Sequence, residues 1–120
     1  MQNINLKLKK IIQNNPAALA SSDFNGRPNI SIVACLKVIN NKQILITDNY
    51  MAQTKKNILK NNRVCLAVWN NKWQGVKIIA QARYYSQGKW QEYVKKMKDN
   101  AGMPAKGAIL LTPKKIINLK

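Results

Sequence analysis

Histidine and acidic side chains are almost missing from this chain. Its 120 residues contain no histidine and four carboxylates, which are Asp23, Asp48, Glu92 and Asp99. Without histidine, the sequence excludes a serine–histidine–aspartate triad and a histidine metal cluster, and four scattered acids argue against a glycosidase-like acid pair. We therefore predict no catalytic side chain and no metal ligand, and we expect any chemistry to come from a bound cofactor.

Cysteine and long apolar runs are also scarce. Cys35 and Cys65 stand in separate apolar runs without C-x-x-C spacing, so we interpret both as buried free thiols. No run approaches the ~18 apolar residues that a membrane-spanning helix needs, and the N-terminal segment interleaves lysines with apolar residues instead of forming a signal-peptide core. We therefore expect a cytoplasmic protein.

Positive charge is abundant. The chain carries 21 Lys and Arg against 4 acids, a formal charge of +17. Such a surplus is typical of nucleic-acid binders and would also attract a phosphorylated ligand. The alternative is AT-rich codon usage, because Lys, Asn and Ile account for 18, 16 and 14 residues. Glutamate, whose codons are also A-rich, occurs once, so both explanations stay open.

The hydrophobic pattern predicts a mainly β (α+β) domain spanning residues 1–120. At this length one core can bury roughly two-thirds of the surface that the unfolded chain exposes. Segment 1–14 is expected to be an amphipathic helix packed on the domain, and helices are also predicted at 51–60 and 88–100. Alternation predicts strands at 17–22, 29–39, 43–47, 63–69, 75–85, 108–111 and 114–119. We interpret them as an antiparallel barrel of about six strands with short flanking helices.

The turn after residue 47 is the first candidate site. Asp48 and Asn49 are residues that favour a helix start, where unpaired backbone N–H groups and the helix dipole can bind a phosphate. Gln53 and Thr54 would add neutral donors, and Lys55 or Lys56 would add a cation. The alternative is an ordinary capped surface helix.

The order of these segments resembles a known family. The runs SSDFNGRPNISIV, ILITDNY and MAQTKKNILKNNRVCLAVW are similar to the FMN-binding split-barrel family related to pyridoxamine 5'-phosphate oxidase. The likeness extends from about residue 15 to residue 119. It implies FMN at the edge of a six-stranded antiparallel split β-barrel, between the subunits of a homodimer.

The resemblance also implies a set of cofactor-binding residues. The family's Lys-Thr pair that binds the FMN phosphate corresponds to Gln53 and Thr54, so Lys55, Lys56, another basic residue or the helix dipole must balance the phosphate charge. The full implied set is Ile30, Ser31, Ile32, Val33, Thr47, Asp48, Asn49, Gln53, Thr54, Lys55 and Asn57.

The expected activity is limited by what the chain lacks. True pyridoxamine 5'-phosphate oxidases are longer and are expected to use His and Arg on their substrate, so this chain is not expected to be one. A small flavoprotein that carries electrons or reduces a small substrate fits better.

Three alternatives stay open. Aromatic residues among lysines could stack on the bases of single-stranded nucleic acid. A deazaflavin or heme could replace FMN in the same fold, although heme would lack a histidine ligand.

Trp73 is the aromatic residue least expected to be buried, and it could reach the cofactor of a partner subunit.

Overall fold

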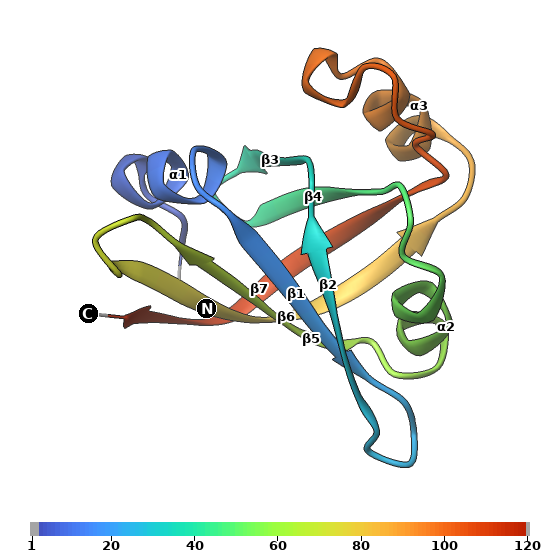
Figure 1. The fold of residues 1–120 in the computed structure, drawn as a ribbon, viewed down its shortest axis with the longest axis horizontal. Coiled ribbons are helices and arrows are strands. Elements are labelled where there is room, and N and C mark those ends of the chain that lie inside the picture. The colour runs from blue at the N-terminus through green and yellow to red at the C-terminus, as the bar shows by residue number, and fades with distance from the viewer. Residues whose placement is uncertain (1–2, 120) are drawn as a thin grey trace.

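Residues 3–119 form a curled antiparallel sheet of seven strands with three α-helices (Figure 1). The computed structural model describes residues 3–119, so residues 1, 2 and 120 of the predicted domain lie outside the described residues. The elements are α1 (Leu6–Gln13), β1 (Ala17–Ser22), β2 (Pro28–Val33), β3 (Leu36–Asn40), β4 (Gln43–Asp48), α2 (Ala52–Lys60), β5 (Arg63–Trp69), β6 (Gly75–Tyr85), α3 (Lys89–Lys95), the 3-10 turn η1 (Lys98–Asn100) and β7 (Gly107–Leu119).

The sheet folds back on itself because its two edges are consecutive in the chain. The strand order is β2-β1-β5-β6-β7-β4-β3, so β2 and β3 form opposite edges. Ala34 and Cys35 alone separate them, and the Thr47 amide of β4 donates to the Cys35 carbonyl at 3.1 Å. This short link gives a half-barrel. The predicted mainly β, split-barrel-like architecture is confirmed.

The predicted count of six strands is wrong. Segment 29–39 was expected to be one strand, but it divides after Val33 and crosses from one sheet edge to the other. Alternation continues across this bend, so the pattern cannot reveal it. Conversely, 108–111 and 114–119 are one strand, since Pro113 pairs with Ala80 at a register shift, where a missing backbone N–H is tolerated.

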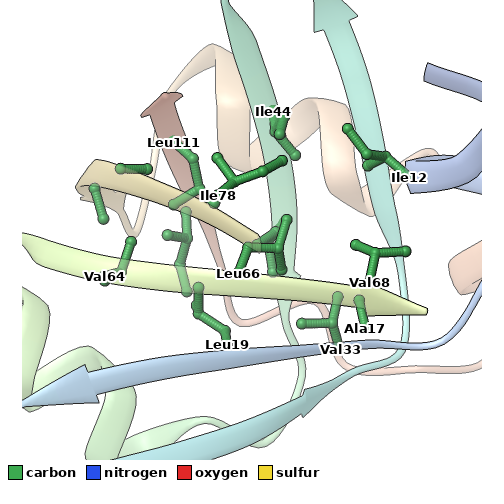
Figure 2. Close-up of a cluster of buried hydrophobic side chains, with 14 of the residues drawn as sticks. Ile12, Ala17, Leu19, Val33, Ile44, Val64, Leu66, Val68, Ile78 and Leu111 are labelled. Carbon is green, nitrogen blue, oxygen red and sulfur yellow. The ribbon is translucent and has the colours of Figure 1, made fainter. Parts of the chain in front are cut away.

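The inward side chains of this half-barrel form the main core. Figure 2 shows side chains from several strands meeting there, among them Leu19, Leu66, Ile78 and Leu111, each fully buried. Helix α1 closes this core with Ile12, also fully buried, and lies against β3. The helix that segment 1–14 predicts therefore packs on the sheet.

A second, smaller core lies under α3. It consists of Leu45, Val94, Ala105, Ala108 and Leu110. The single helix predicted over 88–100 is wrong: α3 ends at Lys95, and a separate 3-10 turn follows.

Two smaller expectations concern exposure and the membrane. Cys35 is buried as expected, but Cys65 is half-buried, because its side chain lies on the outer face of β5. Within residues 3–119, none of the helices has the length and apolar character needed to cross a bilayer.

Candidate cofactor-binding site

A hollow of about 390 Å³ opens beside the edge strand β2, at the end of β4. Its size falls within the range of small-molecule sites. The residues that line it come from β2, the β2–β3 link, β4 with the turn after it, and a distant segment: Ile30, Ser31, Ile32, Ala34, Thr47, Asn49, Tyr50, Met51 and Met103. The structure therefore brings together Ile30, Ser31, Ile32, Thr47 and Asn49 of the predicted site residues.

The hollow has apolar walls and a polar floor. Ile30 and Ile32 are 70% and 87% exposed, which is unusual for isoleucine in a strand. The Thr47 side chain is buried, and its Oγ1 finds no hydrogen-bond partner of normal geometry among the described residues. A buried hydroxyl without a partner is costly, and the residue that carries it is among those that line the hollow.

The thiol of Cys35 lies close to the same hydroxyl. Burial raises the pKa of Cys35, the neighbouring Thr47 side chain lowers it in part, and the negative charge of Asp99 raises it. A neutral thiol is a weak hydrogen-bonding group and does not replace a proper partner for Thr47.

Below the hollow, a polar network fixes α2 to the sheet. The Thr54 hydroxyl is fully buried, bonds to the Ser31 hydroxyl and accepts from Asn29 Nδ2 at 3.0 Å. The Asn57 amide is also buried and donates to Ser21 Oγ at 3.0 Å. The side chains of Thr54 and Asn57 therefore anchor the helix instead of facing open solvent.

The first turn of α2 is the candidate phosphate site. Lys55 N is the first amide to donate to a backbone acceptor, the Met51 carbonyl at 2.9 Å, so the amides of Ala52, Gln53 and Thr54 precede the helical hydrogen bonds. Lys55 Nζ lies 5.0 Å from the centre of the Tyr84 ring, and Lys56 is exposed. Gln53 Nε2 donates to Asn57 Oδ1, so this amide braces the helix along its own face.

Asp48 is a structural anchor of this turn. It is 2% exposed, and its carboxylate accepts from the Met51 amide at 2.8 Å and from the Tyr84 hydroxyl at 2.5 Å. Burial raises the pKa of the Tyr84 phenol, and the hydrogen bond and the charge of Asp48 raise it further. With one hydrogen bond on each oxygen, this buried carboxylate fixes the helix start.

Two other predicted residues also serve the scaffold. Val33 points into the main core and is 9% exposed. Asn49 borders the hollow, but its amide bonds to Asn100 and to the Ala105 amide nitrogen. Some of the predicted site residues therefore line the hollow, whereas others are hydrogen-bonded or packed inside the protein.

Four residues that line the hollow were not predicted from the sequence. Ala34 is placed there by the β2–β3 bend, and Tyr50 and Met51 lie in the turn before α2. Met103 comes from the irregular segment between η1 and β7, which no local pattern links to β2. Lys106, from the same segment, holds its Nζ 5.4 Å from the Tyr50 ring centre.

An uncovered apolar surface adjoins the hollow. We name as the outer apolar face the outward apolar side chains of four paired strands: Ala18, Ala20, Ile30, Ile32, Cys65, Ala67 and Ile79. Lys77 also faces outward there, opposite Ala67. Small residues form its centre, and the three isoleucines are at least 41% exposed. Because Ile30 and Ile32 belong both to this face and to the hollow, anything that covers the face also borders the hollow.

Comparison with known proteins identifies the family of this chain. The family model described as pyridoxamine 5'-phosphate oxidase matches residues 5–120. This chain belongs to the pyridoxamine 5'-phosphate oxidase family. The family predicted from the sequence is thereby confirmed.

Relatives of this family member cover nearly its whole length. The uncharacterized protein MJ0282 of Methanocaldococcus jannaschii is 31% identical over 119 residues, which are 95% of this chain and 79% of that protein. The crystal structure of HupZ from Group A Streptococcus is 25% identical, with a TM-score of 0.86 over 96% of this chain and 93% of HupZ.

More distant solved structures share the fold of this family member. An FMN-binding protein from Syntrophomonas wolfei subsp. wolfei is 15% identical, with a TM-score of 0.77 over 93% of this chain and 83% of that one. The heme storage protein HutZ from Vibrio cholerae is 17% identical, with a TM-score of 0.73 over 99% of this chain and 96% of HutZ. At these identities the likeness establishes the fold and leaves the ligand open.

Three features of this region are compatible with FMN, the cofactor that the sequence resemblance implies. Apolar walls suit a flat ring system, the unpartnered Thr47 hydroxyl suits a polar ring edge, and the start of α2 with two lysines suits a phosphate. Ser31 connects the two parts, since it lines the hollow and bonds to Thr54 in α2.

Proposed function

We propose that this chain is an FMN-binding flavoprotein that carries electrons or reduces a small substrate. The observation that supports this most strongly is the hollow beside β2, which Thr47 helps to line and which lies close to the start of α2. When bound, FMN would supply the redox chemistry, which this chain's few acids and absent histidines do not provide.

The protein's own groups would bind and orient the cofactor. Ile30 and Ile32 would cover one side of the ring, and Thr47 would hydrogen-bond its polar edge. The free amides of the first α2 turn and the charges of Lys55 and Lys56 would balance the phosphate. Glutamine at position 53 leaves these two lysines as the cations of that turn.

We also propose that the functional unit is a homodimer with FMN near its interface. The outer apolar face offers a partner several exposed isoleucines around a flat centre of small side chains. Exposed apolar patches of this kind mark interaction sites. A second copy on this face would exclude water from Ile30 and Ile32, and so from one side of the hollow.

The phosphate site can be tested by comparing FMN with riboflavin, which lacks the phosphate. We expect FMN to bind the wild-type protein more tightly than riboflavin. Lys55→Gln and Lys56→Gln should weaken FMN by about three- to tenfold, and riboflavin little. Lys60→Gln is the matched control, because Lys60 is an exposed lysine at the other end of the same helix. Fluorescence titration provides the affinities.

Three outcomes of the same titrations would contradict the proposal. Equal affinity for FMN and riboflavin would remove the phosphate from the α2 start. Saturable binding of heme or of a deazaflavin in place of FMN would keep the fold and replace the cofactor. Tight, salt-dependent binding of a single-stranded oligonucleotide without FMN uptake would favour the nucleic-acid hypothesis.

Nothing in the arrangement of the aromatic residues favours that last hypothesis over the first. Trp90 packs on the second core beside Tyr93, Tyr84 is bound to Asp48, and Trp73 lies 77% exposed in the β5–β6 turn. Apart from the Trp90–Tyr93 pair on α3, these rings lie on separate elements, whereas stacking successive bases requires a connected series of rings.

A further inference from the structure

The segment between α3 and β7 is fastened to the turn before α2 by a pair of buried amides. Asn49 Nδ2 donates to Asn100 Oδ1 at 2.8 Å, and Asn100 Nδ2 donates back to Asn49 Oδ1 at 3.1 Å. Asn49 Oδ1 also accepts from the Ala105 amide at 2.9 Å. Both asparagines are 4% exposed. We call this pair the amide clasp.

Further bonds hold the end of the segment in the same place. Gln91 Nε2 of α3 donates to the Ala105 carbonyl at 3.1 Å, and the Lys106 amide donates to the Asp48 carbonyl at 2.8 Å. Ala105 has a φ of 46°, a conformation that is unfavourable for a residue with a side chain. The surrounding hydrogen bonds therefore stabilise a backbone shape that alanine would not adopt alone.

Met103 lies in the segment that the clasp fastens. Met103 is between the two fastened points, Asn100 and Ala105, and its side chain lines the hollow while remaining 39% exposed. Every other residue of the lining comes from the part of the chain between Ile30 and Met51. Met103 is thus a wall contributed from a distant part of the sequence.

We infer that Asn49 and Asn100 are positioning residues, whose paired amides hold Met103 as a wall of the FMN hollow and so help to determine how tightly the cofactor is held. This inference rests on the proposed function. The Oδ1 of Asn49 accepts two hydrogen bonds, and its Nδ2 donates one to Asn100. Asn49 therefore acts on the cofactor mainly by holding residues 101–106 in place. Methionine suits the role because its thioether packs favourably against aromatic rings.

A double-mutant cycle tests whether Asn100 acts through Met103. We expect Asn100→Ala to weaken FMN about tenfold, since it leaves a buried amide unpaired and frees the segment. Met103→Ala should weaken FMN about fivefold, and Met103→Leu less than twofold, because leucine keeps the volume. In the Met103→Ala background, Asn100→Ala should add less than about twofold. Asn118→Ala, an exposed site near the far end of β7, is the control.

Several results would overturn the inference. Full additivity of the two substitutions would show that Asn100 does not act through Met103. An unchanged FMN affinity in both Asn100→Ala and Met103→Ala would remove the segment from the site. The Met103 variants keep the test decisive if Asn100→Ala fails to fold, because Met103 is 39% exposed and an unchanged affinity in Met103→Ala is already contradictory.

A second readout works without cofactor. In the FMN-free protein, Asn100→Ala should raise hydrogen exchange at the amides of residues 101–103, 105 and 106 at least tenfold relative to wild type and Asn118→Ala. Unchanged exchange would refute the clasp. If wild-type protein takes up no FMN, the proposed function fails and with it the role of Met103, whereas the exchange result still decides whether the clasp exists.

Discussion

Asp48 illustrates how one residue can serve the site without touching its ligand. It is one of four acids in the chain, and it lies buried between the Met51 amide and the Tyr84 hydroxyl. Gly107 faces the same Tyr84 hydroxyl, where a Cβ would come within 2.2 Å of the oxygen, so only glycine leaves room for it. The acid, the tyrosine and the glycine together fix the start of α2 against β6 and β7.

Removing the tyrosine hydroxyl should therefore cost stability. We expect Tyr84→Phe to lower the free energy of unfolding by about 1–3 kcal/mol at neutral pH, because a buried oxygen of Asp48 loses its donor. Urea denaturation measures this. Tyr93→Phe, an exposed tyrosine on α3, is the control, and equal stability of the two variants would argue against the anchor.

The same pair predicts a dependence on alkaline pH. Because the pKa of Tyr84 is raised in the folded protein, the unfolded chain releases this proton first, near its ordinary value of about 10. The contribution of Tyr84 is thus fully present below about pH 10 and is lost as the pH rises above it. Wild-type stability should fall more steeply above pH 10 than that of Tyr84→Phe; parallel declines would contradict this.

At the scale of elements, α2 is held on the sheet by hydroxyls and amides as well as by apolar contacts. The Thr54 hydroxyl bonds both Ser31 and Asn29 of β2. Thr54→Val keeps the shape and removes the hydroxyl, so we expect a loss of about 1–3 kcal/mol in unfolding free energy. Thr54→Ser should lose less. Thermal or urea unfolding checks both, and a valine variant as stable as wild type would be inconsistent with this network.

The secondary-structure elements also show how much of the fold can be predicted from the sequence. Alternation predicted β1, β4, β5 and β6 almost to the residue, and the residues after β4 predicted the start of α2, because both signals are local. The division between β2 and β3 escaped prediction, since a bend at Ala34 and Cys35 leaves the alternation intact. Pro113 led to the opposite error, because one strand was predicted as two. The register shift that accommodates this proline depends on the pairing of β7 with β6, which the local sequence does not reveal.

The same distinction between local and long-range signals applies to the candidate site. The segments around Ile30, Thr47 and Thr54 were predictable, because each carries part of a motif within one stretch of chain. Which side chains face the hollow was not predictable: Asp48 and Asn49 stand next to Thr47 in sequence, yet their carboxylate and amide are used inside the protein. Met103 could not have been found, because only the folded chain brings it to β2.

At the scale of the whole molecule, the outer apolar face should decide the assembly. We expect Ile32→Glu to convert the proposed dimer to monomers, since it places a charge in the face at its most exposed isoleucine. Light scattering after gel filtration measures the mass. Leu59→Glu, at an exposed leucine on α2, is the control. A monomeric wild type, or a dimeric Ile32→Glu variant, would contradict the proposal.

Cys65 reports on the same face independently. It is half-buried at the centre of the outer apolar face, so a partner subunit should shield its thiol from a thiol reagent. We expect slow labelling of Cys65 in the wild type and at least tenfold faster labelling in Ile32→Glu. Cys65→Ser identifies which thiol reacts. Equal rates in wild type and Ile32→Glu would indicate that this face is open in both.

The central claim is that FMN binds in the hollow beside β2, and methionine-methyl NMR tests it most directly. Met51 and Met103 line the hollow, whereas Met97 packs on the second core and serves as an internal control. On titration with FMN, we predict saturation at about one FMN per chain, with shifts of the Met51 and Met103 methyl signals through the flavin ring current and little change at Met97. Absence of saturable binding, or saturation that leaves Met51 and Met103 unshifted, would contradict the account.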